Sequence, residues 1–132
     1  MGWFDQLRRM SANTALRPQT ERQKTGQDGE DAALAYLSTQ GLTLLERNFR
    51  CKSGEIDLIM QDGATLVFVE VRKRADARHG GAAASVTRAK QARLIIAAQT
   101  WLLRQQRPPA CRFDVIAIDA GAISWLKNAI EA

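Results

Sequence analysis

The sequence is poor in the residues that build zinc centres and disulfide frameworks. Its 132 residues include two cysteines, Cys51 and Cys111, and one histidine, His79. Two cysteines so far apart in the chain cannot form a four-cysteine zinc site or a disulfide framework, and we expect reduced thiols. A single histidine excludes a His-rich zinc centre and the two-histidine helix of metallohydrolases. Oxygen atoms are therefore the metal ligands that remain.

Long apolar runs are also absent. No apolar stretch approaches the roughly 20 residues that a membrane-spanning helix needs, so we expect that the chain does not span a membrane. The first residues carry charge but no apolar stretch and no cleavage site, which argues against a signal peptide and favours a cytoplasmic location. Residues 1–20 are predicted to form an N-terminal extension, and residues 21–132 a single domain.

Positive charge is concentrated in one part of the chain. The hydrophobic fraction of 45% and the charged fraction of 25% are those of a globular protein with a core, and the net charge is +5. Between positions 72 and 93 there is a single acid, Asp76, among seven basic residues. Such a block suits a phosphate backbone, an anionic lipid surface or a solvated face. The basic residues are Arg72, Lys73, Arg74, Arg78, Arg88, Lys90 and Arg93.

The order of the predicted elements indicates the fold class. A helix is predicted over 28–40, with Asp28 as its N-cap and Gly41 as its stop signal. The later elements are strands at 42–50, 54–61 and 64–74, a flexible Gly/Ala-rich stretch at 78–85, a long helix at 85–106, a strand at 112–119 and a short strand or helix at 122–130. This order predicts an α/β fold in which a mixed sheet is flanked by helices. The strand after the long helix is expected to return beside the central strand through a right-handed crossover.

Acidic residues of the second and third strands are predicted to share one face of the sheet. A two-residue turn at Asp62 and Gly63 pairs these strands. In that register Glu55 lies opposite Glu70, and Asp57 is diagonal to Glu70. A diagonal separation of roughly 7–8 Å allows the carboxylates of Asp57 and Glu70 to close on one cation. Because opposed acids repel one another, an oxygen-coordinated Mg²⁺ or Mn²⁺ ion would stabilise this face.

Strand alternation places Arg72 on the same face as these acids. The apolar residues between them are predicted to pack the opposite face, and these are Ile56, Leu58, Val67, Val69 and Val71. A simpler interpretation is that nearby basic residues neutralise the acids in surface salt bridges, the candidates being Arg50, Lys52, Arg72 and Arg74. Three acids and a cation that converge on one face favour a functional site.

Several short motifs, in a fixed order, resemble those of one protein family. They are Gly26-x-x-Gly29-Glu30-x-Ala32-Ala33, Gly54-Glu55-Ile56-Asp57-Leu58-Ile59, Val67-Phe68-Val69-Glu70-Val71-Arg72-x-Arg74, Lys90 with Arg93-Leu94, and Arg112-Phe113-Asp114-Val115. Together they resemble the bacterial UPF0102 family, also called the YraN-like proteins, over nearly everything after about residue 22. That family is similar to archaeal Holliday-junction resolvases and to the restriction-endonuclease-like fold with its PD-(D/E)xK motif.

The resemblance implies a role for each motif residue. Asp57 matches the first acid, Glu70 the second acid, and Arg72 the lysine position. Glu30 resembles the additional helix acid of such resolvases, and its helix would pack across the sheet beside the other two acids. The implied fold is a mixed central sheet with flanking helices, in agreement with the element order. The implied assembly is a homodimer, because junction resolvases cut two strands symmetrically.

The predicted function is metal-dependent hydrolysis of branched or structured DNA. Asp57 and Glu70 would hold Mg²⁺ or Mn²⁺, with Glu55 or Glu30 completing the shell, and a metal-activated water would attack the phosphodiester in line. Arg72 would contact the scissile phosphate. The other basic residues would bind the neighbouring phosphates of the DNA backbone, which would make binding sensitive to salt. These residues are Arg74, Arg78, Arg88, Lys90 and Arg93.

The arginine at the lysine position leaves other hypotheses open. Arginine can clamp a phosphate, but it stays protonated and cannot act as a base. Lys90 on the long helix could replace the motif lysine, or the chain could be a nucleic-acid-binding protein with weakened or lost catalysis. Arg88, Lys90 and Arg93 could also be only the solvated side of their helix. A structural or regulatory adaptor, whose basic face meets an acidic protein, is the third hypothesis.

Overall fold

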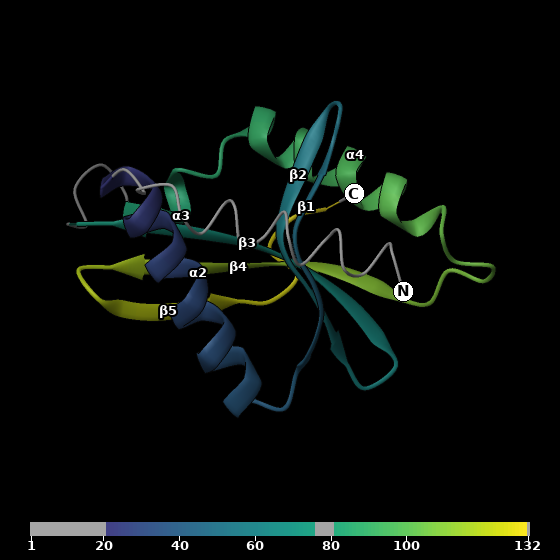
Figure 1. Cartoon of the computed structure of the whole chain (residues 1–132), viewed down its shortest axis with the longest axis horizontal. Coiled ribbons are helices and arrows are strands. Elements are labelled where there is room, and N and C mark those ends of the chain that lie inside the picture. The colour runs from purple at the N-terminus through teal and green to yellow at the C-terminus, as the bar shows by residue number, and fades with distance from the viewer. Residues whose placement is uncertain (1–20, 76–80, 132) are drawn as a thin grey trace, which may run out of the picture.

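The described part of the chain places a layer of strands between helices (Figure 1). The computed structural model describes residues 21–75 and 81–131, and the predicted extension at 1–20 lies outside them. The elements are α2 (Glu21–Thr39), β1 (Thr43–Cys51), β2 (Gly54–Asp62), β3 (Thr65–Arg74), α3 (Gly81–Ala84), α4 (Arg88–Leu102), β4 (Cys111–Asp119) and β5 (Ala122–Leu126). Among the described residues, no helix is long and apolar enough to cross a membrane.

The five strands form a mixed sheet in the order β1-β2-β3-β4-β5. Only β3 and β4 are parallel, and the other neighbouring pairs are antiparallel. A parallel pair needs a crossover connection, and the chain segment with α3 and α4 supplies it. The prediction that the strand after the long helix lies beside the central strand is confirmed. The α/β class is confirmed as well, and the arrangement is consistent with a restriction-endonuclease-like fold.

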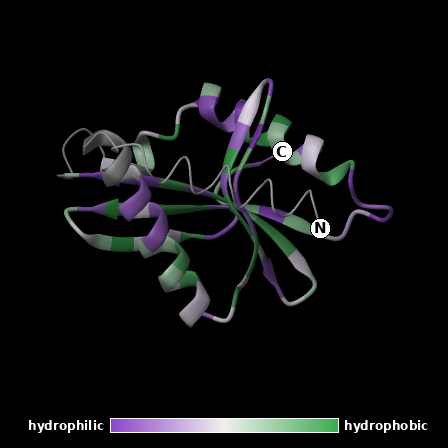
Figure 2. Cartoon of the chain, viewed as in Figure 1, coloured by the Kyte–Doolittle hydropathy of each residue, from purple (hydrophilic) through white to green (hydrophobic). Residues whose placement is uncertain are grey.

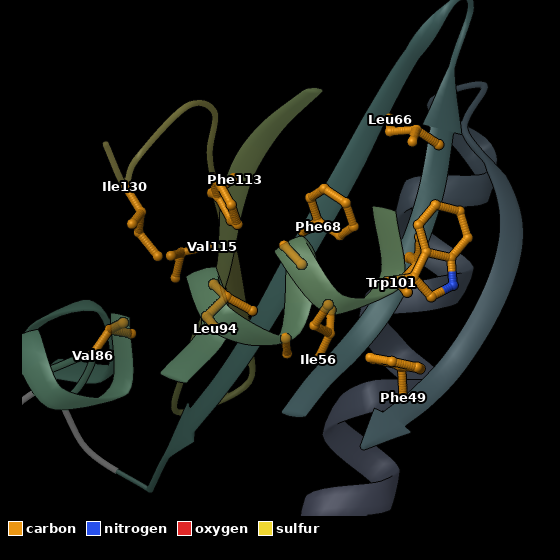
Figure 3. Close-up of a cluster of buried hydrophobic side chains, with 13 residues drawn as sticks. Phe49, Ile56, Leu66, Phe68, Val86, Leu94, Trp101, Phe113, Val115 and Ile130 are labelled. Carbon is orange, nitrogen blue, oxygen red and sulfur yellow. The ribbon is translucent and has the colours of Figure 1, made fainter. Parts of the chain in front are cut away.

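Each face of the sheet has its own hydrophobic core. Leu37 of α2 packs on one face against Leu58 and Val69, among other residues. Leu94 and Trp101 of α4 pack on the opposite face, as Figure 3 shows. The rings of Trp101 and Phe68 meet edge to face, with 6.0 Å between their centroids. Figure 2 shows that the inner strands are mostly hydrophobic, whereas the helices mix hydrophobic and hydrophilic residues, as amphipathic covers of a core do.

Two element predictions are corrected by the structure. The first helix begins at Glu21, so Asp28 lies inside it and is not the N-cap. The preceding residues include Glu, Arg, Gln and Lys, which have good helix propensity and extend the helix without an apolar stripe. The stretch predicted to be flexible contains the short helix α3. The last segment, predicted to be a short strand or helix, contains the strand β5. The stop at Gly41 is confirmed, because its φ of +94° ends the helix.

The turn between β2 and β3 lies at Gly63 and Ala64, one residue later than predicted. Asp62 stays in β2 and pairs with Thr65. Gly63 takes the first loop position with a φ of +60°, a conformation that glycine adopts without strain. Asp62 in turn accepts a hydrogen bond of 3.0 Å from Nη2 of Arg112 on β4, which holds it in the strand. In the observed register, Leu58 pairs with Val69.

β2 and β3 separate at Asp57. β2 pairs with β3 only from Leu58 to Asp62, although it pairs with β1 back to Gly54. β3 continues beside β4 as far as Arg74. Figure 1 shows the tip of the β1–β2 hairpin turning away from the C-terminal half of β3. The two strands therefore form a fork, and Asp57 is the first residue of β2 beyond the paired region.

The fork explains why one packing prediction is wrong. Ile56 was expected to share a face with Leu58 and Val69, but it lies in the core under α4 with Phe68. Leu58 and Val69 lie in the core under α2. The regular alternation of side chains fails at this point because β2 leaves β3 and follows β1. One side of the fork is thus anchored to α4, and the carboxylate of Asp57 stands at its opening.

Candidate active site

Two partly buried carboxyl groups meet at the fork between β2 and β3. The carboxyl groups of Asp57 and Glu70 lie close enough for each to change the pKa of the other. The observed register brings Asp57 level with Glu70, so the predicted diagonal arrangement is wrong and the pair is closer than expected. The Oδ2 atom of Asp57 also accepts a hydrogen bond of 2.8 Å from the N–H of Val71. This bond takes the place of strand pairing and holds the Asp57 carboxylate against β3.

Burial raises the pKa of both carboxyl groups. Burial, with a further contribution from the charge of Asp57, raises the pKa of Glu70 to about 8. Burial also raises the pKa of Asp57, against the lowering effect of the Val71 N–H. A pKa of about 8 favours the protonated form of Glu70 at neutral pH when no cation is bound. A ligand that brings positive charge to the pair would displace that proton.

Glu30 contributes a third carboxyl group from α2. Burial and the charge of Asp57 raise the pKa of Glu30 to about 7. Its Oε1 atom is buried without a hydrogen-bond partner and lies 3.9 Å from Nη2 of Arg47 on β1. Arg47 makes a closer ion pair, at 2.8 Å, with Asp31. The helix acid that the resemblance implied thus lies within electrostatic range of Asp57, with one oxygen atom unused.

Glu55 lies farther out than the other acids. Its side chain is 54% exposed and pairs with Arg50 at 3.6 Å, as the salt-bridge interpretation expected for this residue. Its charge still contributes to the raised pKa values of Asp57 and Glu70. Within residues 21–75 and 81–131, no group of three or more His, Cys, Asp or Glu side chains is arranged to hold a metal ion. The role of Glu55 as a metal ligand therefore stays a prediction.

Arg72 lies directly beside the acid pair. Its Nη1 atom is 3.7 Å from Oε1 of Glu70, and its side chain is 25% exposed. Its Nε atom donates a hydrogen bond of 2.9 Å to Oγ of Ser85, the residue that follows α3. Sequence reasoning missed Ser85, because no periodicity in the Gly/Ala-rich stretch indicates that it returns to β3. The structure therefore adds one polar residue to the site.

The predicted basic residues gather on one side of the pair. Partial burial lowers the pKa of Lys90, and repulsion from Arg72, Arg74 and Arg93 lowers it further, whereas Glu70 opposes the change. These three arginines and Glu70 therefore lie within electrostatic range of Lys90. Arg88 is exposed at the start of α4. Arg78 lies outside the described residues.

The sequence matches the model of the uncharacterised protein family UPF0102 over residues 29–118. A UPF0102 protein of Herminiimonas arsenicoxydans is 72% identical over 116 residues, which cover 88% of this chain and 94% of that protein. The chain belongs to the UPF0102 family. A UPF0102 protein of Janthinobacterium sp. (strain Marseille) is 68% identical over 117 residues, covering 89% of this chain and 95% of that protein. One from Ralstonia pickettii is 58% identical, covering 85% and 94%.

The UPF0102 match includes the whole described site. Residues 29–118 contain the acids Glu30, Asp57 and Glu70 as well as Arg72 and Lys90. The family description names no activity, so the function has to be argued from the chemistry of these residues.

Another motif residue of this UPF0102 protein has a structural role. Asp114 is fully buried, and both of its carboxylate oxygens accept hydrogen bonds. The donors are Nε of Arg112 at 3.1 Å, Nε1 of Trp125 at 2.9 Å and the N–H of Asn128 at 2.8 Å. Because its oxygen atoms are occupied in this way, Asp114 ties β4 to β5 and the segment after it rather than serving the candidate site.

Proposed function

We propose that this UPF0102 protein binds the phosphodiester backbone of branched or structured DNA and hydrolyses it with Mg²⁺ or Mn²⁺. One observation carries the proposal. Asp57 and Glu70 form a partly buried carboxyl pair at a strand fork, Arg72 lies beside Glu70, and Lys90 lies within electrostatic range of Glu70. Perturbed acids beside concentrated positive charge are typical of sites that bind a phosphate and a metal ion together.

The donor atoms at the fork suit a hard divalent cation. Asp57 and Glu70 offer oxygen atoms only. Their pKa values are raised by burial and by the charge of neighbouring carboxylates, and a bound cation would oppose both effects. The unpartnered Oε1 atom of Glu30 is a further oxygen donor nearby. These three residues would hold the ion. When bound, the ion would lower the pKa of a water molecule and neutralise charge that develops on the phosphate.

The basic residues have the complementary task of binding the substrate. The guanidinium of Arg72 presents several N–H donors to a phosphate oxygen beside Glu70. Arg74, Lys90 and Arg93 would bind the adjoining phosphates, which orients the backbone without reading its sequence. Lys90 has an additional role open to it, because its lowered pKa makes the neutral amine more accessible than in an ordinary lysine.

Arg72 also favours a second candidate function, DNA binding with weak or no cleavage. An arginine stays protonated and cannot take a proton from the attacking water. A protonated Glu70 would further weaken metal binding near neutral pH. The same residues would then act as a phosphate-binding surface, and the acid pair would be a remnant of metal chemistry.

Two measurements separate these functions. Calorimetric titration with Mn²⁺ is expected to give binding to the wild type and loss of binding in Asp57→Asn. Asp28→Asn is the control and should bind like the wild type, because Asp28 is an exposed residue of α2 that is not part of the acid pair. Fluorescence anisotropy with a four-way junction and a linear duplex of the same sequence, across a salt series, is expected to give salt-sensitive binding that favours the junction.

Each outcome selects one hypothesis. Absence of Mn²⁺ binding by the wild type contradicts the metal-dependent nuclease. DNA binding without cleavage in Mn²⁺ supports the second candidate. Binding that does not depend on salt contradicts any contact with phosphates, and it would leave the hypothesis of an adaptor for an acidic protein.

A further inference from the structure

The guanidinium of Arg72 is held at two points. Nη1 lies 3.7 Å from the Glu70 carboxyl group, and Nε donates to Oγ of Ser85 at 2.9 Å. A guanidinium is a rigid plane with five N–H donors. Fixing the Nε atom and one terminal nitrogen therefore fixes the direction of the whole plane, and the guanidinium has further N–H groups that can donate to a ligand.

Ser85 is itself fixed by the short helix before it. Its hydroxyl group donates its single proton to the carbonyl oxygen of Ala82, at 2.6 Å. The lone pairs of Oγ are thus left for Arg72. The N–H of Ala82 donates to Oδ1 of Asp119 at 2.7 Å, which anchors α3 to the end of β4. A continuous chain of hydrogen bonds therefore runs from Asp119 through α3 and Ser85 to Arg72.

We propose that Ser85 is a positioning residue that locks the guanidinium of Arg72 in the direction in which it binds an oxyanion beside Glu70. The identity of that oxyanion as a phosphodiester rests on the proposed function. Lysine carries all its donors on one rotating ammonium group, so a serine that fixes an internal N–H is useful only to an arginine. Ser85 is thus the counterpart of the arginine at the motif's lysine position.

The proposal is tested first without DNA, on the full chain labelled with ¹⁵N. The Nε–H signal of Arg72 is expected to exchange with water about tenfold faster in Ser85→Ala than in the wild type, because one charge-assisted hydrogen bond is lost. Ser85→Thr, which keeps the hydroxyl group, should restore slow exchange. Ser124→Ala, at an exposed serine of β5, is the matched control and should match the wild type. Asp119→Ala, which frees α3, should act in the same direction as Ser85→Ala.

The second measurement is titration with inorganic phosphate, followed at the Arg72 signal. Ser85→Ala is expected to bind phosphate about fivefold more weakly than the wild type, and Ser85→Thr within twofold of it. Equal exchange rates, or equal phosphate affinities, in Ser85→Ala and the wild type would overturn the positioning role.

Junction binding then separates this inference from the proposed function. Ser85→Ala is expected to weaken binding about fivefold with the salt dependence unchanged, whereas Arg72→Gln should reduce the salt slope by about one, since it removes a charge. If the wild type does not bind DNA while its phosphate binding depends on Ser85 as described, the proposed function is wrong and the positioning role is supported. If DNA binding is strong and indifferent to Ser85, the positioning role fails alone.

Discussion

Carboxyl protonation governs the electrostatics of single residues in the site. The pKa of Glu70 is raised to about 8 and that of Glu30 to about 7, from an ordinary value of 4.5. Burial is the first cause for both, and the charge of Asp57 is the second. The folded protein consequently binds more protons than the unfolded chain between pH 4.5 and 8, and stability must fall as pH rises across that range.

The first prediction concerns this loss of stability. In metal-free buffer, the free energy of unfolding is expected to fall by about 2 kcal/mol between pH 6 and pH 9, as Glu70 is forced to ionise in the fold. The stabilising contribution of the protonated group is complete below its unfolded pKa and disappears as pH rises through its folded pKa. Glu70→Gln, which keeps the shape without the titration, should flatten the decline. Urea unfolding at several pH values measures it.

Glu131→Gln is the control for this prediction, because Glu131 is exposed near the end of the chain. It should keep the wild-type dependence on pH. An identical decline in Glu70→Gln and the wild type would show that Glu70 is ionised in the folded protein at neutral pH.

At the scale of elements, the contact between β2 and α4 determines the shape of the fork. Gly54 begins β2, and a Cβ atom there would overlap the carbonyl oxygen of Arg93 and lie 3.2 Å from Cβ of Ala97. The absence of a side chain thus allows the backbones of β2 and α4 to touch. This close approach holds the first turns of α4, with Lys90, against the strand that carries Asp57.

The second prediction follows from this contact. Gly54→Ala is expected to destabilise the fold by about 2 kcal/mol, because the rigid carbonyl of Arg93 has to move. Junction binding should weaken as well, since Lys90 and Arg93 move away from the fork. Gly26→Ala is the matched control, because a Cβ at Gly26 in α2 has nothing within 4 Å. That variant should gain stability, by up to about 1 kcal/mol, through helix propensity. Urea unfolding and anisotropy measure both variants.

The elements themselves were largely predictable from the sequence. The runs at 42–50, 54–61, 64–74 and 112–119 correspond to β1 to β4, because β-branched and aromatic residues between turn signals leave few alternatives. The short helix α3 was not predicted, since its stability depends on Asp119, which is distant in the sequence. The turn was misplaced because Asp62 is kept in β2 by Arg112 of another strand.

At the scale of the whole molecule, positive charge surrounds the fork. Arg72, Arg74 and Arg93 all lower the pKa of Lys90, although the first two are in β3 and the others in α4. The cations repel one another in the free protein. An anionic partner that lies across both elements, as the proposed DNA backbone would, is expected to relieve this repulsion.

The third prediction tests how the cluster contributes to binding. The double variant Arg74→Gln and Arg93→Gln is expected to reduce the salt slope of junction binding by about two, because each phosphate contact contributes about one. Arg107→Gln is the control, because Arg107 is exposed beyond the C-terminal end of α4 and should leave the slope unchanged. Equal slopes in the double variant and the wild type would place the DNA on another surface.

The sequence alone determined the α/β class, the mixed sheet and the identity of the acids and cations, because these depend on local patterning and on residue type. The tertiary structure decided how they meet. Asp57 lies level with Glu70 because the turn is at Gly63, and its carboxylate faces Val71 because β2 leaves β3. The raised pKa values of Glu30 and Glu70, and the hydrogen bond from Arg72 to Ser85, likewise depend on burial and on contacts between distant segments. A sequence pattern contains neither.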